Sequence, residues 1–283
     1  MRYLFIFMLT IMTLLGEPLK FSPLPMDKAP KIFLQYNSVL QYLEEQTGYK
    51  FELVYSSSYK DLIRNFKLGK IDVIELGPLP FVKLKKDYKD AEAFLTFKSK
   101  NGKANYTCDV MTSDENIDSL KDLFELNLHK KIFLTRRLST CGYLMTEFMF
   151  KNYNKTLDDY HYNYIGTHSD VLLELLLTPN SIGTVKSTVG NKYKHLKFRK
   201  IAQSASIPGF AFIANKKTIS PKVIKKIQDA VLKLNPLENE SDREIVSTWG
   251  ANIKYGAIKT KPNTYKTVEK AAQEILMKDD KNR

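Results

Sequence analysis

The sequence contains few of the residues that build metal sites and disulfide scaffolds. Its 283 residues include two cysteines and four histidines. Two cysteines are too few for a disulfide scaffold. His161 and His168 are seven residues apart, with no acidic or cysteine partner at metal-ligand spacing. The sequence motifs of serine hydrolases, phosphate-binding loops and paired-carboxylate enzymes are also missing. We therefore predict no metal site, no cofactor and no catalytic residues.

Arginine is scarce too, although the chain is strongly basic. Lysine and arginine number 44 against 31 acidic residues, a formal charge of +13, yet only seven of the 44 are arginine. The lysines are scattered along the whole chain, whereas base recognition favours clustered arginines with aromatic neighbours. We interpret the charge as a lysine-rich solvated surface and predict no nucleic-acid partner. Such a surface would raise the association rate of an anionic ligand.

Long apolar runs are missing except at the N-terminus. An apolar segment from Tyr3 to Leu15 is too short to span a bilayer comfortably, but its length suits a secretory signal peptide. We predict a signal peptide over residues 1–16 and export to a periplasm. If it is not cleaved, the same segment would anchor the protein to the membrane.

The remaining sequence alternates short β-rich runs with amphipathic helical patterns, and its length suits roughly two α/β lobes. Ser58 stands at the N-cap of one helical pattern, and Ser220 precedes a proline at the start of another. This alternation indicates βαβ units and a mostly parallel sheet. The predicted strands lie at 19–24, 51–55, 70–76, 92–97, 106–112, 130–135, 196–202 and 209–215. The predicted helices lie at 38–48, 58–69, from 77, from about 143, at 168–177, from 221, from a capping box at 241–244, and at 264–277, the last packing on the first lobe.

One junction concentrates polar groups between a strand and a helix. The stretch "LTRRLSTCGYLMTEFMF", residues 134–150, places two arginines, two hydroxyls, a thiol and a glycine there. A helix N-terminus can hold an anion, and Ser139 and Thr140 would add hydroxyl donors while Gly142 lets the backbone approach. Arg136 and Arg137 would add charge-assisted bonds to the oxygens of the anion. Alternatively, Ser139 only caps the helix and the arginines face solvent. The motif alone leaves both interpretations open.

Several stretches taken together carry a family resemblance. In "SSSYKDL", "LGKIDVIELGPLPF", "ANYTCDV", "LSTCGYL" and "IGTHSD", the chain resembles the PhnD-type solute-binding proteins of phosphonate, phosphite and phosphate ABC transporters, over residues 21–234. The resemblance implies an α/β, type II periplasmic binding-protein fold, with two doubly wound lobes, two hinge crossings and a ligand cleft between the lobes. We expect lobe 1 at 17–105 plus 207–283 and lobe 2 at 106–206. Closure would occur near residues 105–106 and 206–208.

The resemblance also implies a set of ligand-binding residues. The family's Ser-Thr-Ser cradle corresponds to Ser139, Thr140 and Cys141. Its two binding tyrosines correspond to Tyr59 and Tyr106, and its histidine to His168. With Gly77, Arg136 and Gly142 added from the residue patterns, the predicted oxyanion site consists of Tyr59, Gly77, Tyr106, Arg136, Ser139, Thr140, Cys141, Gly142 and His168.

Three positions depart from the family pattern. Cys141 replaces a serine and is a weaker hydrogen-bond donor. Arg136 and Arg137 stand where the family often has Asp-Pro. Where the family offers a carboxylate to the ammonium of an aminophosphonate, this chain has Pro208 or Gly209, so we predict weak selection for the amine.

The two cysteines are expected on the cleft side. Residues Tyr106 and Cys108 face the same side of a strand, and Cys141 lies in the cradle. A disulfide between Cys108 and Cys141, a contact with a soft ligand such as arsenite, and two unpaired thiols all remain open at this point.

The function that these patterns favour is that of a monomeric, non-enzymatic receptor in the periplasm. It would capture a small oxyanion, namely phosphate, phosphite or a phosphonate, and deliver it to an ABC-transporter permease. One alternative is ligand sensing for a histidine kinase. A second is an enzyme on the same fold, against which the predicted signal peptide and the missing acid/base pair weigh.

Overall fold

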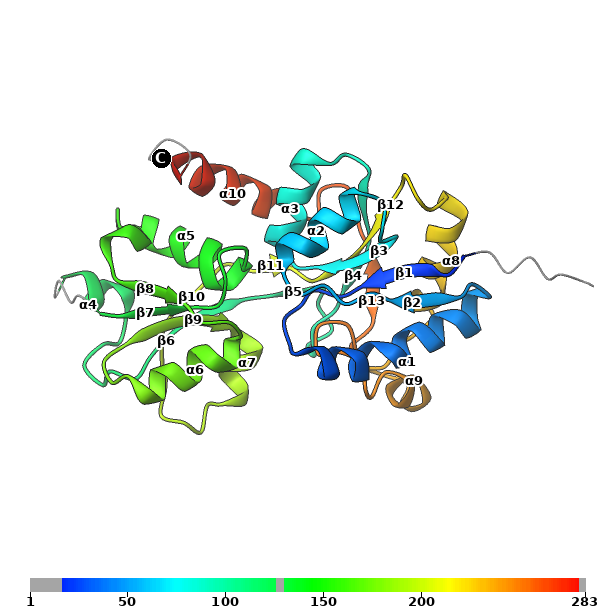
Figure 1. The fold of residues 1–283 in the computed structure, drawn as a ribbon. Helices are drawn as coiled ribbons and strands as arrows, with labels where there is room; N and C mark the ends of the chain where they lie inside the picture. Colours follow the sequence, from blue (N-terminus) through cyan, green and yellow to red (C-terminus); the bar gives the residue numbers. More distant parts are fainter. Residues whose placement is uncertain (1–16, 126–129, 280–283) are drawn as a thin grey trace, which may run out of the picture.

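The computed structural model describes residues 17–125 and 130–279, and the predicted signal peptide, residues 1–16, lies outside them. The chain forms two lobes, each built on one sheet (Figure 1). No helix of the described part is long and apolar enough to cross a bilayer.

The first lobe is built on a six-stranded sheet in the order β13-β4-β12-β3-β1-β2. The first three strands of the chain pair in parallel, as predicted, and the other three pair antiparallel. All four residues of β3 are buried because helices cover both faces of the sheet. The strands are β1 (Leu19–Ser22), β2 (Phe51–Leu53), β3 (Val73–Leu76), β4 (Ala91–Phe97), β12 (Ala211–Asn215) and β13 (Ala257–Lys259).

The second lobe is built on a five-stranded sheet in the order β10-β6-β9-β7-β8. Strand β7 pairs in parallel with β8 and β9, while β6 pairs antiparallel with β9 and β10. The strands are β6 (Cys108–Thr112), β7 (Ile132–Leu134), β8 (Tyr162–Tyr164), β9 (Ile182–Lys186) and β10 (Arg199–Gln203). Two α/β lobes of this kind confirm the predicted fold class.

Helices lie on both faces of each sheet (Figure 1). In the first lobe these are α1 (Ala29–Thr47), α2 (Tyr59–Lys67), α3 (Pro78–Asp87), α8 (Pro221–Leu232) and α9 (Glu240–Ile245). In the second lobe they are α4 (Leu120–Glu125), the π-helical turn η1 (Thr140–Met145), α5 (Thr146–Lys151), the 3-10 turn η2 (Leu157–Asp159), α6 (His168–Leu177) and α7 (Ser187–Lys192).

Two short strands connect the lobes. Strand β5 (Asn105–Tyr106) pairs antiparallel with β11 (Ile207–Pro208), so the two crossings lie side by side. The last helix, α10 (Lys266–Asp279), packs on α3 of the first lobe and also on η1 and α5 of the second. The prediction that it packs on the first lobe was therefore incomplete, because this helix bridges both.

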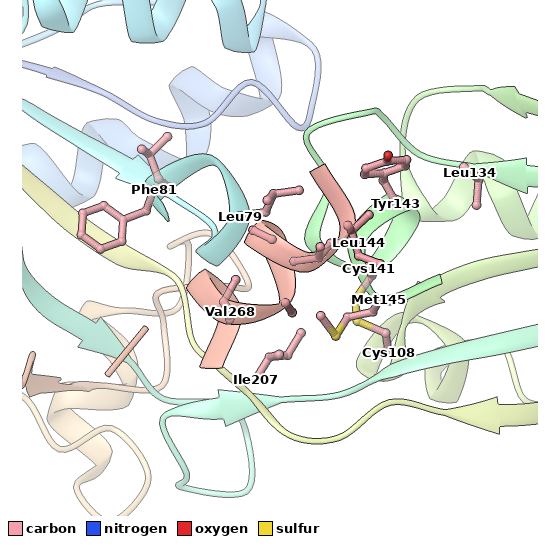
Figure 2. Packing of buried hydrophobic residues seen from close by; sticks show 14 of the residues in the cluster. Leu79, Phe81, Cys108, Leu134, Cys141, Tyr143, Leu144, Met145, Ile207 and Val268 are labelled. Carbon is pink, nitrogen blue, oxygen red and sulfur yellow. A yellow bond between two sulfur atoms is a disulfide. The ribbon is translucent and has the colours of Figure 1, made fainter. Parts of the chain in front are cut away.

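One apolar cluster runs across this bridge. Leu79 of α3, Leu144 of η1 and Val268 of α10 belong to it and lie near one another in Figure 2. All three are almost fully buried, so the contact between the lobes behind the cleft is held by apolar packing. On the exposed side of the same contact between α10 and α5, the Lys151 ammonium and the Glu274 carboxylate form an ion pair of 2.7 Å.

Several helix boundaries differ from the predictions. Ser58 and Ser220 cap α2 and α8 as predicted. Helix α1 begins at Ala29 rather than residue 38, because a proline fits its first turn and its early residues already bury an apolar face. The predicted capping box at 241–244 is wrong, since Asn239 caps α9 through the Asp242 amide. The helix expected from about 143 begins at Thr140.

Candidate functional site

A cavity of about 850 Å³ lies between the lobes. Its wall contains eight of the nine residues that the sequence singled out. They are Tyr59, Gly77, Tyr106, Arg136, Ser139, Thr140, Cys141 and His168. The ninth, Gly142, does not line the cavity.

Four helices begin at this wall. Tyr59 is the first residue of α2, Gly77 is the N-cap of α3, Ser139 is the N-cap of η1 and Thr167 is the N-cap of α6. Two of these helices belong to each lobe. The first amides of a helix lack intrahelical acceptors and carry partial positive charge. The partly positive N-termini of four helices, two from each lobe, therefore lie at the cavity wall.

The cradle predicted at the start of η1 also contacts the opposite lobe. The Ser139 hydroxyl caps the helix by accepting from the Gly142 amide at 3.0 Å. The Thr140 hydroxyl accepts from the Leu79 amide of α3, also at 3.0 Å, and shares a hydrogen bond with Tyr106. Ser139 therefore caps its helix, as one alternative predicts, and it also lines the cavity, while anion binding at the cradle stays a prediction.

The two arginines of the motif lie in different environments. Arg136 lines the cavity, donates to the Gly166 carbonyl at 3.1 Å and lies over the Tyr59 ring at 5.6 Å. Arg137 is exposed and lies over the Tyr143 ring at 5.7 Å, away from the cavity wall. Burial raises the pKa of Tyr59 to about 12, although the Arg136 charge opposes this. The phenol therefore remains a neutral donor near pH 7.

Gly142 has a packing role that the sequence did not indicate. A Cβ at this position would lie 2.1 Å from Oγ1 of Thr135. The glycine lets η1 pack closely on the end of β7, and its amide already donates to Ser139. Thr135 fills the space where a Cβ of Gly142 would lie, and the expected approach of a ligand to this backbone stays a prediction.

The two cysteines form a disulfide, which settles the alternatives left open by the sequence (Figure 2). Cys108 lies at the start of β6 and Cys141 in η1, with their Cα atoms 5.3 Å apart. Neither thiol is free, so direct arsenite coordination by these thiols does not apply to the oxidised protein. The bond ties the cradle to the central part of the second sheet.

His168 is a neutral donor toward the cavity. Its Nδ1 accepts from the Lys186 amide at 3.3 Å, which leaves the proton on Nε2. Burial, followed by the charges of Lys186 and Arg136, lowers the pKa of His168 to about 3. The imidazole therefore stays uncharged at neutral pH.

The lowered pKa of His168 predicts acid sensitivity. Below pH 6.5 the unfolded chain gains a proton at His168 that the folded protein does not. The free energy of unfolding should therefore fall more steeply in the wild type than in His168→Gln, and the difference in slope should approach about 1.4 kcal/mol per pH unit near pH 5. Urea unfolding at pH 7, 6 and 5 measures this difference. His195→Gln, which changes an exposed histidine, serves as the control, and equal slopes for wild type and His168→Gln would contradict the prediction.

Sequence reasoning missed two buried ionisable residues beside the cavity, Glu75 and Lys186. Glu75 of β3 is fully buried and accepts a hydrogen bond from the Tyr36 hydroxyl. Burial raises the pKa of Glu75 to about 7, although the Tyr36 bond and the Lys186 charge act to lower it. Lys186, the last residue of β9, lines the cavity and donates to Asn252 of the first lobe at 2.8 Å. The sequence feature that could have indicated them is a charged residue in an otherwise apolar run, Glu75 in "VIEL" and Lys186 at the end of "IGTVK".

Comparison with known proteins gives one family match and several structural matches. Residues 21–265 match the family model of ABC transporter, phosphonate, periplasmic substrate-binding proteins. PhnD1 from Prochlorococcus marinus, solved with methylphosphonate, has a TM-score of 0.75 at 14% identity, covering 91% of this chain and 98% of that one. A binding protein of a Pseudomonas aeruginosa phosphonate transporter has a TM-score of 0.76 at 17% identity, covering 95% and 90%.

A third structure has a different ligand. A Xanthomonas citri protein bound to ATP has a TM-score of 0.74 at 13% identity, covering 92% of this chain and 98% of that one. At identities this low, the three structures establish a shared fold and not a shared ligand.

Proposed function

Because this chain belongs to the family of periplasmic substrate-binding proteins of phosphonate ABC transporters, we propose that its cleft captures a small phosphorus oxyanion. The permease of such a transporter would be its partner, and the receptor would act as a monomer. Members of this family are binding proteins rather than enzymes, and they act in the periplasm.

The observation that supports this ligand class is the meeting of four helix N-termini at one cavity. Helices α2 and α3 contribute from the first lobe, and η1 and α6 from the second. Free amides and hydroxyls at such ends bind phosphoryl oxygens without needing a full countercharge. Tyr59 and His168, both neutral donors, add directed hydrogen bonds.

The contacts between the lobes suggest how capture could be coupled to closure. The Leu79 amide to Thr140 bond and the Lys186 to Asn252 bond both cross the cleft. Rotation about β5 and β11, with residues 17–105 plus 207–283 moving against 106–206, would break them. A bound anion would accept from both lobes at once and so favour the closed arrangement.

A thermal-shift and calorimetry panel tests this function. The probes are phosphate, phosphite, methylphosphonate and 2-aminoethylphosphonate, with sulfate as an anion of similar size. We expect one or more of the phosphorus oxyanions to stabilise the protein by about 2.7 kcal/mol at 100 times its dissociation constant. Stabilisation by sulfate alone, or by none of the probes, would contradict the proposal.

A further inference from the structure

The cavity wall carries more positive charge than one phosphoryl group requires. Within the described part of the chain, six cationic residues line it, against one acid. The acid, Asp27, is already paired with Lys31 at 2.8 Å. The cationic residues are Lys31, Lys98, Lys100, Arg136, Lys186 and Lys192.

Lys186 differs from the lysines of the rim. Lys100 and Lys192 are exposed, whereas Lys186 is 9% exposed. Its ammonium lies 4.6 Å from the centre of the Tyr106 ring and 5.1 Å from that of Phe210, and it donates to Asn252. A lysine is rarely buried without an anionic partner, because its charge loses solvation.

Glu75 is the acid whose charge favours the protonated form of this lysine. Its carboxyl does not line the cavity, and it already accepts a hydrogen bond from Tyr36. Burial raises the pKa of Glu75 to about 7 and lowers the pKa of Lys186 to about 8, so at pH 7.5 both side chains are mostly charged. The inner wall therefore keeps a net positive charge from Arg136 and Lys186.

Lys186 also lies close to the cradle. The Tyr106 hydroxyl bonds with the Thr140 side chain, while the face of the same ring meets the Lys186 ammonium. The cradle and the ammonium are thus separated by little more than one tyrosine ring. A short molecule could reach both.

On the basis of the proposed function, we propose that the ligand is a phosphonate or phosphate bearing a second anionic group, a carboxylate, and that Lys186 binds this group. The cradle of Ser139 and Thr140 holds the phosphoryl end. An ammonium in the place of the carboxylate would face two cations, and the wall residues that the structure describes include no unpaired acid. The same site therefore disfavours aminophosphonates.

Calorimetry on the full-length protein at pH 7.5 tests the assignment with methylphosphonate, phosphonoacetate and 2-aminoethylphosphonate. Phosphonoacetate should bind about tenfold or more tightly than methylphosphonate, because a charged hydrogen bond at Lys186 is added. Lys186→Met also removes the bond to Asn252, so the diagnostic quantity is the ratio of the two affinities, which should fall to within about threefold of one. The control, Lys192→Met at the exposed rim, should keep the advantage.

Each outcome separates the inference from the proposed function. Equal affinities of the wild type for methylphosphonate and phosphonoacetate, or a preference for 2-aminoethylphosphonate, would overturn the inference and leave oxyanion capture intact. An advantage retained in Lys186→Met would overturn the role of Lys186. No binding of any of the three would overturn the proposed function itself. If Lys186→Met does not fold, Lys186→Gln replaces it, and the wild-type comparison stands without a variant.

Discussion

The double variant Cys108→Ala/Cys141→Ala should lose about 3 to 4 kcal/mol of unfolding free energy relative to the oxidised wild type. The disulfide closes a loop of 33 residues, and the chain-entropy model gives this magnitude for a loop of that length. Both sulfurs are buried, so the smaller side chains add a modest packing loss. The melting temperature should fall by roughly 10 °C.

Reduction of the wild type provides the matched comparison. Dithiothreitol should lower the denaturation midpoint of the wild type toward that of the double variant and leave the variant unchanged. Because Cys141 is part of η1, reduced wild type should also bind the best phosphorus oxyanion of the panel more weakly. A denaturation midpoint that is insensitive to dithiothreitol would show that the bond does not stabilise the protein.

The strands and helices that frame the cavity could be predicted because their signals are local. The caps at Ser58 and Ser220 and the alternating runs depend on neighbouring residues only. The start of α1 was missed because the first apolar positions of that helix precede the stretch with the clearest periodicity. The cap of α9 was misplaced by two residues, since Asn239 competes with Ser241 for the same role.

The least predictable features depend on contacts between distant segments. The pairing of Cys108 with Cys141 requires η1 to pack against β6, and the distance between the two cysteines in the sequence does not show this. The ammonium of Lys186 lies at the inner wall of the cavity because β9 ends at the cleft and because it donates to Asn252 of the other lobe. Conversely, eight of the residues identified by motif and pattern share one cavity wall, because helix starts after parallel strands gather at one edge of a sheet.

Replacing the hydroxyl of Thr140 should weaken anion binding far more than it weakens the fold. Thr140→Val keeps the shape of the side chain and removes the acceptor of the Leu79 amide and the partner of Tyr106. In the closed, ligand-bound state that amide would be buried without its partner, and a hydroxyl donor to the ligand would be lost. We expect the dissociation constant of the best phosphorus oxyanion to rise by about 10- to 100-fold.

The stability of the unliganded protein should change by less than about 1 kcal/mol, because the lobes can separate and let water bind the Leu79 amide. Calorimetry and urea unfolding on the same preparation compare the two quantities. Thr188→Val, at an exposed position on the same wall, is the control and should change neither. An unchanged dissociation constant in Thr140→Val would remove the cradle from the binding site. A stability loss large enough to account for the weaker binding would reduce Thr140 to a packing residue.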